Sequence, residues 1–118
     1  MLGDALQLLK VGQVAAILRC STDHVHHLIG SGRLAASRRE AAAAWRVPAI
    51  AVARLVGARI PRPSRGNDDL LDLDDVVQLS GFCERSVRQD LVSGRLAGRR
   101  IGRRWLVGVA AYRTWAGL

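Results

Sequence analysis

The sequence predicts a mainly α-helical protein with small β-hairpins, in which the order α-α-β-β-α occurs twice. The first observation behind this prediction is an internal repeat, because a shift of 62 residues makes positions 31–35 identical to positions 93–97. Beyond that block the shift becomes 60 and aligns Trp45 with Trp105. The second observation is the stretch between the copies, whose prolines and glycines are typical of a linker. We therefore predict one unit over residues 1–60, a linker over 61–68 and a second unit over 69–118.

The second copy begins with two helices separated by a tight turn. Asp72 is a suitable N-cap and Gly81 a suitable C-cap, which predicts a helix over residues 73–80. The next helix is expected to start at residue 83 or 84 and to stop before Gly94, with its apolar positions on one side.

Two strands and a third helix complete the second copy. Residues 99–107 are typical of two short strands, and the turn between them is expected at Gly102-Arg103. A closing helix is expected over about residues 109–115.

The first copy follows the same plan with weaker signals. Lys10 stands at the N-cap position, where Gln13 can still act as a capping-box partner, and Ser21 is expected to cap the second helix. Pro48 fits the first turn of the closing helix. Residues 40–44 favour a helix over a hairpin, so we expect the strand region of this copy to be distorted, longer or partly helical.

The charge of the chain indicates a polyanionic partner. The 118 residues carry 18 basic and 10 acidic side chains, a formal net charge of +8, and nucleic acid is the usual partner of a small basic domain. The apolar run at residues 49–56 is too short to span a membrane and is interrupted by Arg54. We expect a cytoplasmic, nucleoid-associated protein without a cofactor. Because no phosphate-binding loop, nucleophile elbow or paired metal motif occurs, we do not expect an enzyme.

Two more specific alternatives are metal binding by a cysteine and histidines, and insertion of tryptophan side chains into DNA. Cys20, His24 and His27 have spacings that suit one helical face, and His26 is adjacent. Zinc usually needs four ligands, or three and a water, and the second copy has no histidine, so we expect no metal.

Three tryptophans are expected in the cores. Trp45 and Trp105 occupy matching positions, and Trp115 aligns with Leu55. Small domains depend on large buried aromatic side chains, which favours burial over stacking on DNA.

The second copy resembles a known family of DNA-binding domains. The residues that carry the resemblance are Leu70-Leu-Asp-Leu-Asp-Asp-Val-Val-Gln-Leu-Ser-Gly81, Ser86-Val87, Ser93-Gly-Arg-Leu96 and Arg100-Ile-Gly-Arg-Arg-Trp105. This pattern resembles the excisionase-type winged helix-turn-helix family, which is related to the MerR-like domains. The resemblance implies a tandem winged helix-turn-helix protein whose second helices enter the major groove and whose wings contact the backbone or the minor groove. Family members act as phage or plasmid excision factors and as transcription regulators.

The expected DNA contacts come from both copies. In the second copy, arginine can bind guanine and glutamine can bind adenine from the outward face of the recognition helix, and wing arginines can neutralise phosphates. These residues are Arg85, Arg88 and Gln89 on the helix and Arg99, Arg100, Arg103 and Arg104 on the wing. In the first copy the base contacts are expected from Thr22, His26 and His27 and the backbone contacts from Arg38, Arg39 and Arg46.

Two interpretations of the first copy stay open. It can supply a second DNA reader for a neighbouring half-site, because a linker of about 10 residues reaches about 30 Å when extended. Alternatively, residues 1–60 form a protein-interaction or dimerisation module for a partner such as an integrase or RNA polymerase. In either case the second copy is expected to supply most of the affinity for DNA.

Overall fold

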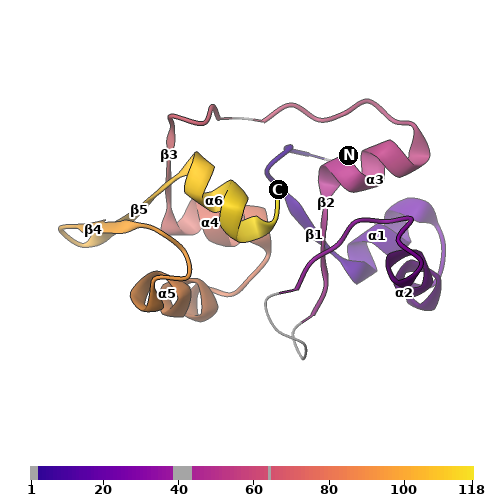
Figure 1. The fold of residues 1–118 in the computed structure, drawn as a ribbon, viewed down its shortest axis with the longest axis horizontal. Coiled ribbons are helices and arrows are strands. Elements are labelled where there is room, and N and C mark those ends of the chain that lie inside the picture. The colour runs from indigo at the N-terminus through magenta and orange to yellow at the C-terminus, as the bar shows by residue number, and fades with distance from the viewer. Residues whose placement is uncertain (1–2, 39–43, 64) are drawn as a thin grey trace. The chain divides into compact units, whose positions relative to one another are not determined.

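The computed structural model describes residues 3–38, 44–63 and 65–118. The chain divides into two compact units, unit 1 (Met1–Arg62) and unit 2 (Pro63–Leu118). The described residues form six helices and two small antiparallel sheets (Figure 1). This agrees with the predicted class of mainly helical protein with β-hairpins.

Unit 2 contains three helices and a three-stranded sheet. Its elements are β3 (Leu70–Asp72), α4 (Leu73–Ser80), α5 (Glu84–Ser93), β4 (Arg99–Ile101), β5 (Arg104–Gly108) and α6 (Val109–Ala116). The Asp72 carboxylate accepts from the Asp75 N–H at 2.8 Å, and Asp75 returns a bond to the Asp72 N–H at 3.0 Å. This reciprocal pair begins α4, and Gly81 ends it with a left-handed φ of 72°. The helices and the hairpin of this copy therefore lie within about two residues of their predicted positions.

Unit 1 repeats this order with less complete strands. Its elements are β1 (Leu8–Lys10), α1 (Val11–Leu18), α2 (Thr22–Gly30), β2 (Arg46–Pro48) and α3 (Ala49–Val56). The Gln13 side chain accepts from the Lys10 N–H at 2.8 Å, and the Ser21 hydroxyl accepts from the His24 N–H at 3.1 Å, as predicted. Pro48 is the last residue of β2 and the N-cap of α3. Its prediction inside the first helical turn was wrong by one position, because a φ of −59° suits a strand end as well as a helix start.

Each unit opens with a short strand that the predicted order lacks. β1 pairs with β2 and places Leu9 opposite Val47, and β3 pairs with β5 and places Leu71 opposite Val107. Three residues are too few for an alternating pattern to indicate a strand. The order in unit 2 is therefore β-α-α-β-β-α, and the first strand anchors the chain to the hairpin.

The hairpin position of unit 1 is only partly described. A single bridge joins Ser37 to Arg46, and the two sequence shifts make it the counterpart of the Arg99–Leu106 pair in unit 2. The irregular segment predicted at residues 40–44 falls mostly outside the described residues.

The fully buried core side chains are aliphatic except for Tyr112, and the tryptophans predicted there are only partly buried. Trp45, Trp105 and Trp115 are each half-buried, whereas Tyr112 is fully buried. Trp115 borders the core of its unit, since its ring packs against Tyr112 and its indole N–H donates to the buried Asp90 carboxylate at 2.8 Å. Other fully buried side chains are Val14, Val25, Leu34, Val47 and Val52 in unit 1 and Leu71, Val76, Val87, Leu96 and Val107 in unit 2.

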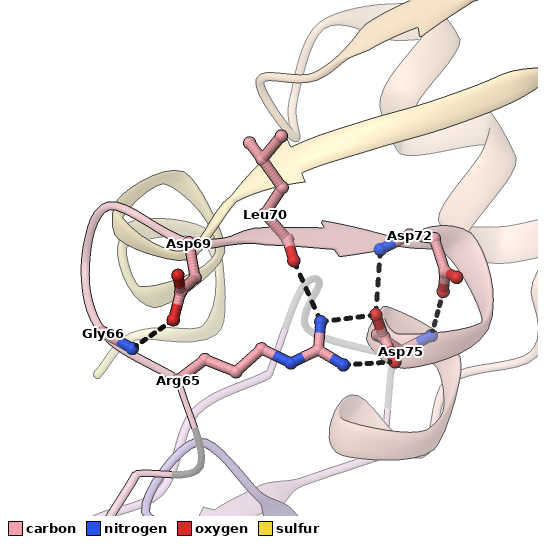
Figure 2. Close-up of polar contacts among 6 residues, drawn as sticks. All are labelled: Arg65, Gly66, Asp69, Leu70, Asp72 and Asp75. Atoms are coloured by element: carbon pink, nitrogen blue, oxygen red, sulfur yellow. Dashed lines mark hydrogen bonds and ion pairs between the residues drawn. The ribbon is translucent and has the colours of Figure 1, made fainter.

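Both ends of the predicted linker are held by hydrogen bonds. On one side the Arg62 carbonyl accepts from the Ala5 N–H at 3.3 Å. On the other, Arg65 donates to both Asp75 oxygens at 2.7 and 3.2 Å and to the Leu70 carbonyl at 2.9 Å (Figure 2). The predicted linker, residues 61–68, therefore includes residues that form hydrogen bonds with each unit.

Candidate nucleic-acid interface

Helix α5 separates a buried face from an exposed face of mixed chemistry. Val87 and Leu91 are buried, as is Asp90, which accepts the indole bond from Trp115. Positions three and four residues apart lie on the same side of a helix, so the remaining positions face outward. The exposed residues of α5 are Glu84, Arg85, Arg88, Gln89, Val92 and Ser93.

Arg88 is held by a carboxylate that the sequence interpretation left out of the site. Its Nε and Nη2 atoms donate to Glu84 Oε1 at 3.1 and 2.9 Å. Both side chains are more than half exposed, at 55% for Arg88 and 58% for Glu84. An exposed pair four residues apart stabilises a helix by only about 0.3–0.5 kcal/mol. It therefore orients Arg88 along the helix surface and opens readily for another acceptor.

The hairpin presents four exposed arginines around a tight turn. Gly102 has a φ of 64°, the left-handed conformation that glycine adopts at no steric cost. Arg100 pairs with Trp105, and Arg99 pairs with Leu106. Because successive strand residues point to opposite faces, Arg100 shares the sheet face of Trp105 and Val107, and Arg99 shares the opposite face with Leu106.

A shallow recess brings part of the predicted site together. Its volume is about 210 Å³, and it is lined by Asp72, Leu73, Asp74, Glu84, Arg88, Arg103, Arg104 and Trp105. The structure thus joins Arg88 of the helix to Arg103 and Arg104 of the hairpin. The three carboxylates make the recess itself electrically mixed, and the other exposed arginines of these two elements, Arg85 on α5 and Arg99 and Arg100 on the hairpin, lie outside it. Figure 1 shows the β4–β5 hairpin extending away from α4 and α6 in unit 2.

The corresponding helix of unit 1 has weaker cationic character. Thr22, His26 and His27 are exposed on α2 as expected. A shift of 62 residues puts Asp23 in the position of Arg85. The rings of His24 and His27 stack with centroids 6.4 Å apart, so the face is aromatic and polar and carries an acid at its start.

The predicted backbone contacts of unit 1 are reduced by local packing. Arg38 lies over the Trp45 ring, with its guanidinium carbon 4.4 Å from the centroid. Arg46 is only 8% exposed and donates to the Trp45 carbonyl at 3.2 Å; burial lowers the pKa of its guanidinium. Such a side chain has little surface left for a phosphate, so we leave Arg46 out of the interface. Arg39 lies outside the described residues.

Metal and membrane features are not found in the described part of the chain. Within residues 3–38, 44–63 and 65–118, no group of three or more histidine, cysteine, aspartate or glutamate side chains is placed to hold a metal ion. In the same ranges, no helix has the length and apolar character needed to cross a membrane.

Comparisons with protein-family models, with curated proteins and with solved structures give no match to this chain. The geometry of the two units is therefore the basis for inferring function.

Proposed function

We propose that this chain binds double-stranded DNA as a tandem winged helix-turn-helix protein and that unit 2 supplies most of the affinity. In this proposal α5 enters the major groove and the β4–β5 hairpin acts as the wing. The observation that carries it is the recess in which Arg88 of α5 meets Arg103 and Arg104 of the hairpin. A helix face and a hairpin joined in this way can contact base edges and the neighbouring backbone together.

The outward face of α5 matches the hydrogen-bonding pattern of the major groove. Arginine donates to the two acceptors of guanine, glutamine pairs with adenine, and a carboxylate accepts from the amino group of cytosine. Arg88 and Glu84 therefore suit the two bases of one G·C pair, and the weak bond between them is exchanged for bonds to the bases. Gln89 and Arg85 extend the contact along the helix.

The charge of the last quarter of the chain favours the same conclusion. From residue 91 to residue 118 there are six arginines and no acidic residue. Exposed surfaces normally carry both signs, whereas a surface that follows a phosphate backbone carries mainly cations. This composition supports binding to nucleic acid.

Fluorescence anisotropy with a labelled 30-bp duplex of random sequence at low salt tests the proposal. The wild-type chain is expected to bind, and a double variant, Arg85→Ala with Arg88→Ala, is expected to bind at least tenfold more weakly. A double variant with the same loss of charge, Arg54→Ala with Arg59→Ala, is the matched control. Absence of binding by the wild type, or equal losses in the two variants, would contradict the proposal.

The cellular output that this proposal favours is that of an excision factor or a transcription regulator. A second role for unit 1, as a protein-interaction or dimerisation module for an integrase or a polymerase, is favoured by the burial of Arg46 and the stacking of Arg38 on Trp45. A triple alanine variant at Thr22, His26 and His27 separates the two roles. Unchanged duplex affinity would favour the interaction module, and a loss comparable to that of the α5 variant would favour a second DNA reader.

A further inference from the structure

The sheet of unit 2 has one closed face and one open face. On the closed face, Leu71 and Val107 pair across β3 and β5 and are at most 1% exposed. On the open face, Leu70 is 57% exposed and Ile101 is 60% exposed. Both are large apolar side chains, and each exposes far more surface than is usual for a sheet residue.

A glycine explains why Leu70 lacks a neighbour. Leu70 pairs with Gly108, and a Cβ atom built on Gly108 would meet no atom within 4 Å. The counterpart pair in unit 1 is Leu8 with Pro48. Unit 1 therefore has a proline side chain at the position where Gly108 of unit 2 has none. Figure 2 shows the Leu70 side chain pointing away from the Arg65–Asp75 network, so that network does not cover it.

The gap belongs to an apolar recess of about 450 Å³ on the open face. It is lined by Leu70, Ala97, Gly98, Arg99, Ile101, Leu106 and Gly108. Arg99 is the one charged side chain among these seven residues, and none of them is acidic. A phosphate backbone requires several cations at close spacing, and this lining offers one cation on an apolar floor.

We propose that this open face binds an apolar segment of a partner protein that also carries acidic side chains. Its apolar side chains fill the recess over Gly108 and cover Leu70 and Ile101, and a carboxylate pairs with Arg99. A second copy of this chain, paired through the same face, is a poorer occupant, because it would bring a second Arg99 to the same recess. Contiguous apolar surface with a polar rim is typical of protein-binding sites.

The partner site and the proposed DNA contact use different side chains of unit 2. The recess that contains Arg88 of α5 and the apolar recess share no lining residue. Arg104 of the first recess pairs with Ile101 and therefore lies on the open face as well. The partner site thus goes beyond the proposed DNA contact, and it assigns Arg99 to the partner in place of the phosphate contact expected from the sequence.

Selection of random dodecapeptides displayed on phage, with the full chain as bait, tests this inference. The expected peptides combine apolar residues with aspartate or glutamate. Their affinity, measured by fluorescence polarisation, is expected to fall at least tenfold in Gly108→Leu, which fills the recess, and in Arg99→Glu. Gly108 has an ordinary φ of −66°, so the new side chain meets no backbone strain. Leu70→Ser, in β3 and outside the hairpin, tests the same surface if Gly108→Leu does not fold.

Duplex affinity of the same variants separates this inference from the proposed function. Gly108→Leu and Leu70→Ser are expected to bind the random duplex within twofold of the wild type. The inference is overturned if no peptide is enriched, if the enriched peptides bind Gly108→Leu or Leu70→Ser as tightly as the wild type, or if they are neutral or basic. It is also overturned if the two variants lose duplex affinity, since the face would then belong to the DNA interface. Failure of the wild type to bind DNA, with intact peptide binding, would count against the proposed function alone.

Discussion

The indole N–H of Trp115 donates to a carboxylate oxygen of Asp90 at 2.8 Å, and Asp90 is 2% exposed. This bond joins α6 to the buried side of α5, the helix whose opposite side carries the proposed base contacts. Phe82 packs edge-on against the same indole at 5.6 Å. The orientation of α5 therefore depends on a residue near the end of the chain.

Replacing Trp115 with phenylalanine is expected to destabilise unit 2 by about 1–3 kcal/mol, because the buried Asp90 carboxylate loses one donor. The smaller ring also loses part of the packing against Phe82 and Tyr112, which adds to the loss. Urea unfolding followed by circular dichroism measures the effect. Val92→Ala, at a position 77% exposed, is the control and should leave the midpoint unchanged; an equal shift in both variants would contradict the assignment.

The lowered pKa of Asp75 makes the free energy of unfolding of unit 2 depend on pH. Desolvation raises the pKa of Asp75, but the hydrogen bond from the Asp72 backbone and the bonds and charge of Arg65 outweigh it, so the pKa is lowered. A lowered pKa in the folded state stabilises the protein above the unfolded pKa of about 3.9, and this stabilisation is lost as the pH falls through the folded value.

The stability difference between the wild type and Asp75→Asn is therefore expected to be largest at pH 7 and to shrink at pH 3. Urea midpoints at the two values measure it. Asp74→Asn is the matched control, because it removes an exposed carboxylate from the same helical turn. A difference that does not change with pH would show that the charge of Asp75 contributes nothing.

The Glu84–Arg88 pair predicts opposite effects of two substitutions on DNA affinity. Glu84→Gln removes repulsion from phosphates and is expected to raise affinity for random duplexes, while it weakens the preference for one G·C pair. Arg88→Ala is expected to lower affinity for preferred sites by about 1–3 kcal/mol. Selection from a randomised duplex library, followed by anisotropy on the selected sites, measures both effects. Changes of the same sign in both variants would contradict the pairing with one base pair.

Removal of Arg103 is expected to change the salt dependence of DNA binding without changing the sequence preference. An arginine that contacts a phosphate contributes about one unit to the slope of the logarithm of affinity against the logarithm of salt concentration. Arg103→Ala is therefore expected to flatten that slope by about one and to weaken all duplexes alike. A titration between 50 and 200 mM salt measures the slope, and an unchanged slope would remove Arg103 from the interface.

Cys83 offers a chemical probe of the start of α5. It is exposed, and hydrogen bonds from Ser86 and neighbouring N–H groups lower the pKa of its thiol. Because the thiolate is the reactive form, iodoacetamide is expected to modify Cys83 faster than the half-buried Cys20, and Ser86→Ala is expected to slow the reaction. A bound duplex should protect Cys83, measured by mass spectrometry of the peptides. Equal modification with and without duplex would place the DNA elsewhere.

Local signals determined most of the element positions. Asp72 and Gly81 act through bonds and dihedrals within a few residues, which is why α4 was predicted from residue types alone. The strands β1 and β3 were missed, because three residues become a strand only through partners about 40 residues away. The burial of Arg46 and the partial exposure of the three tryptophans were missed for a similar reason, since burial depends on what packs from other elements.

The candidate site was predicted more completely in unit 2 than in unit 1. Arg85, Arg88 and Gln89 are exposed on one helix face, as their spacing required. Glu84 was left out although its separation of four residues from Arg88 is the spacing of a helical ion pair. The apolar recess around Gly108 gave no local signal, because it arises from three strands meeting at one face.

The hydrogen bonds of Arg62 and Arg65 shorten the free connection between the units, and this affects which DNA sites the chain can bind. Where Arg62 and Arg65 keep these bonds on DNA, the two residues between them can extend over at most about 10 Å. If both units contact one duplex, such a short connection allows only certain spacings between the two half-sites. Each inserted base pair rotates the second half-site by roughly 35° around the helix axis, at 10–10.5 base pairs per turn. Insertions of one to five base pairs would then move the second half-site out of phase, and the chain would discriminate among operators by their spacing as well as by their bases.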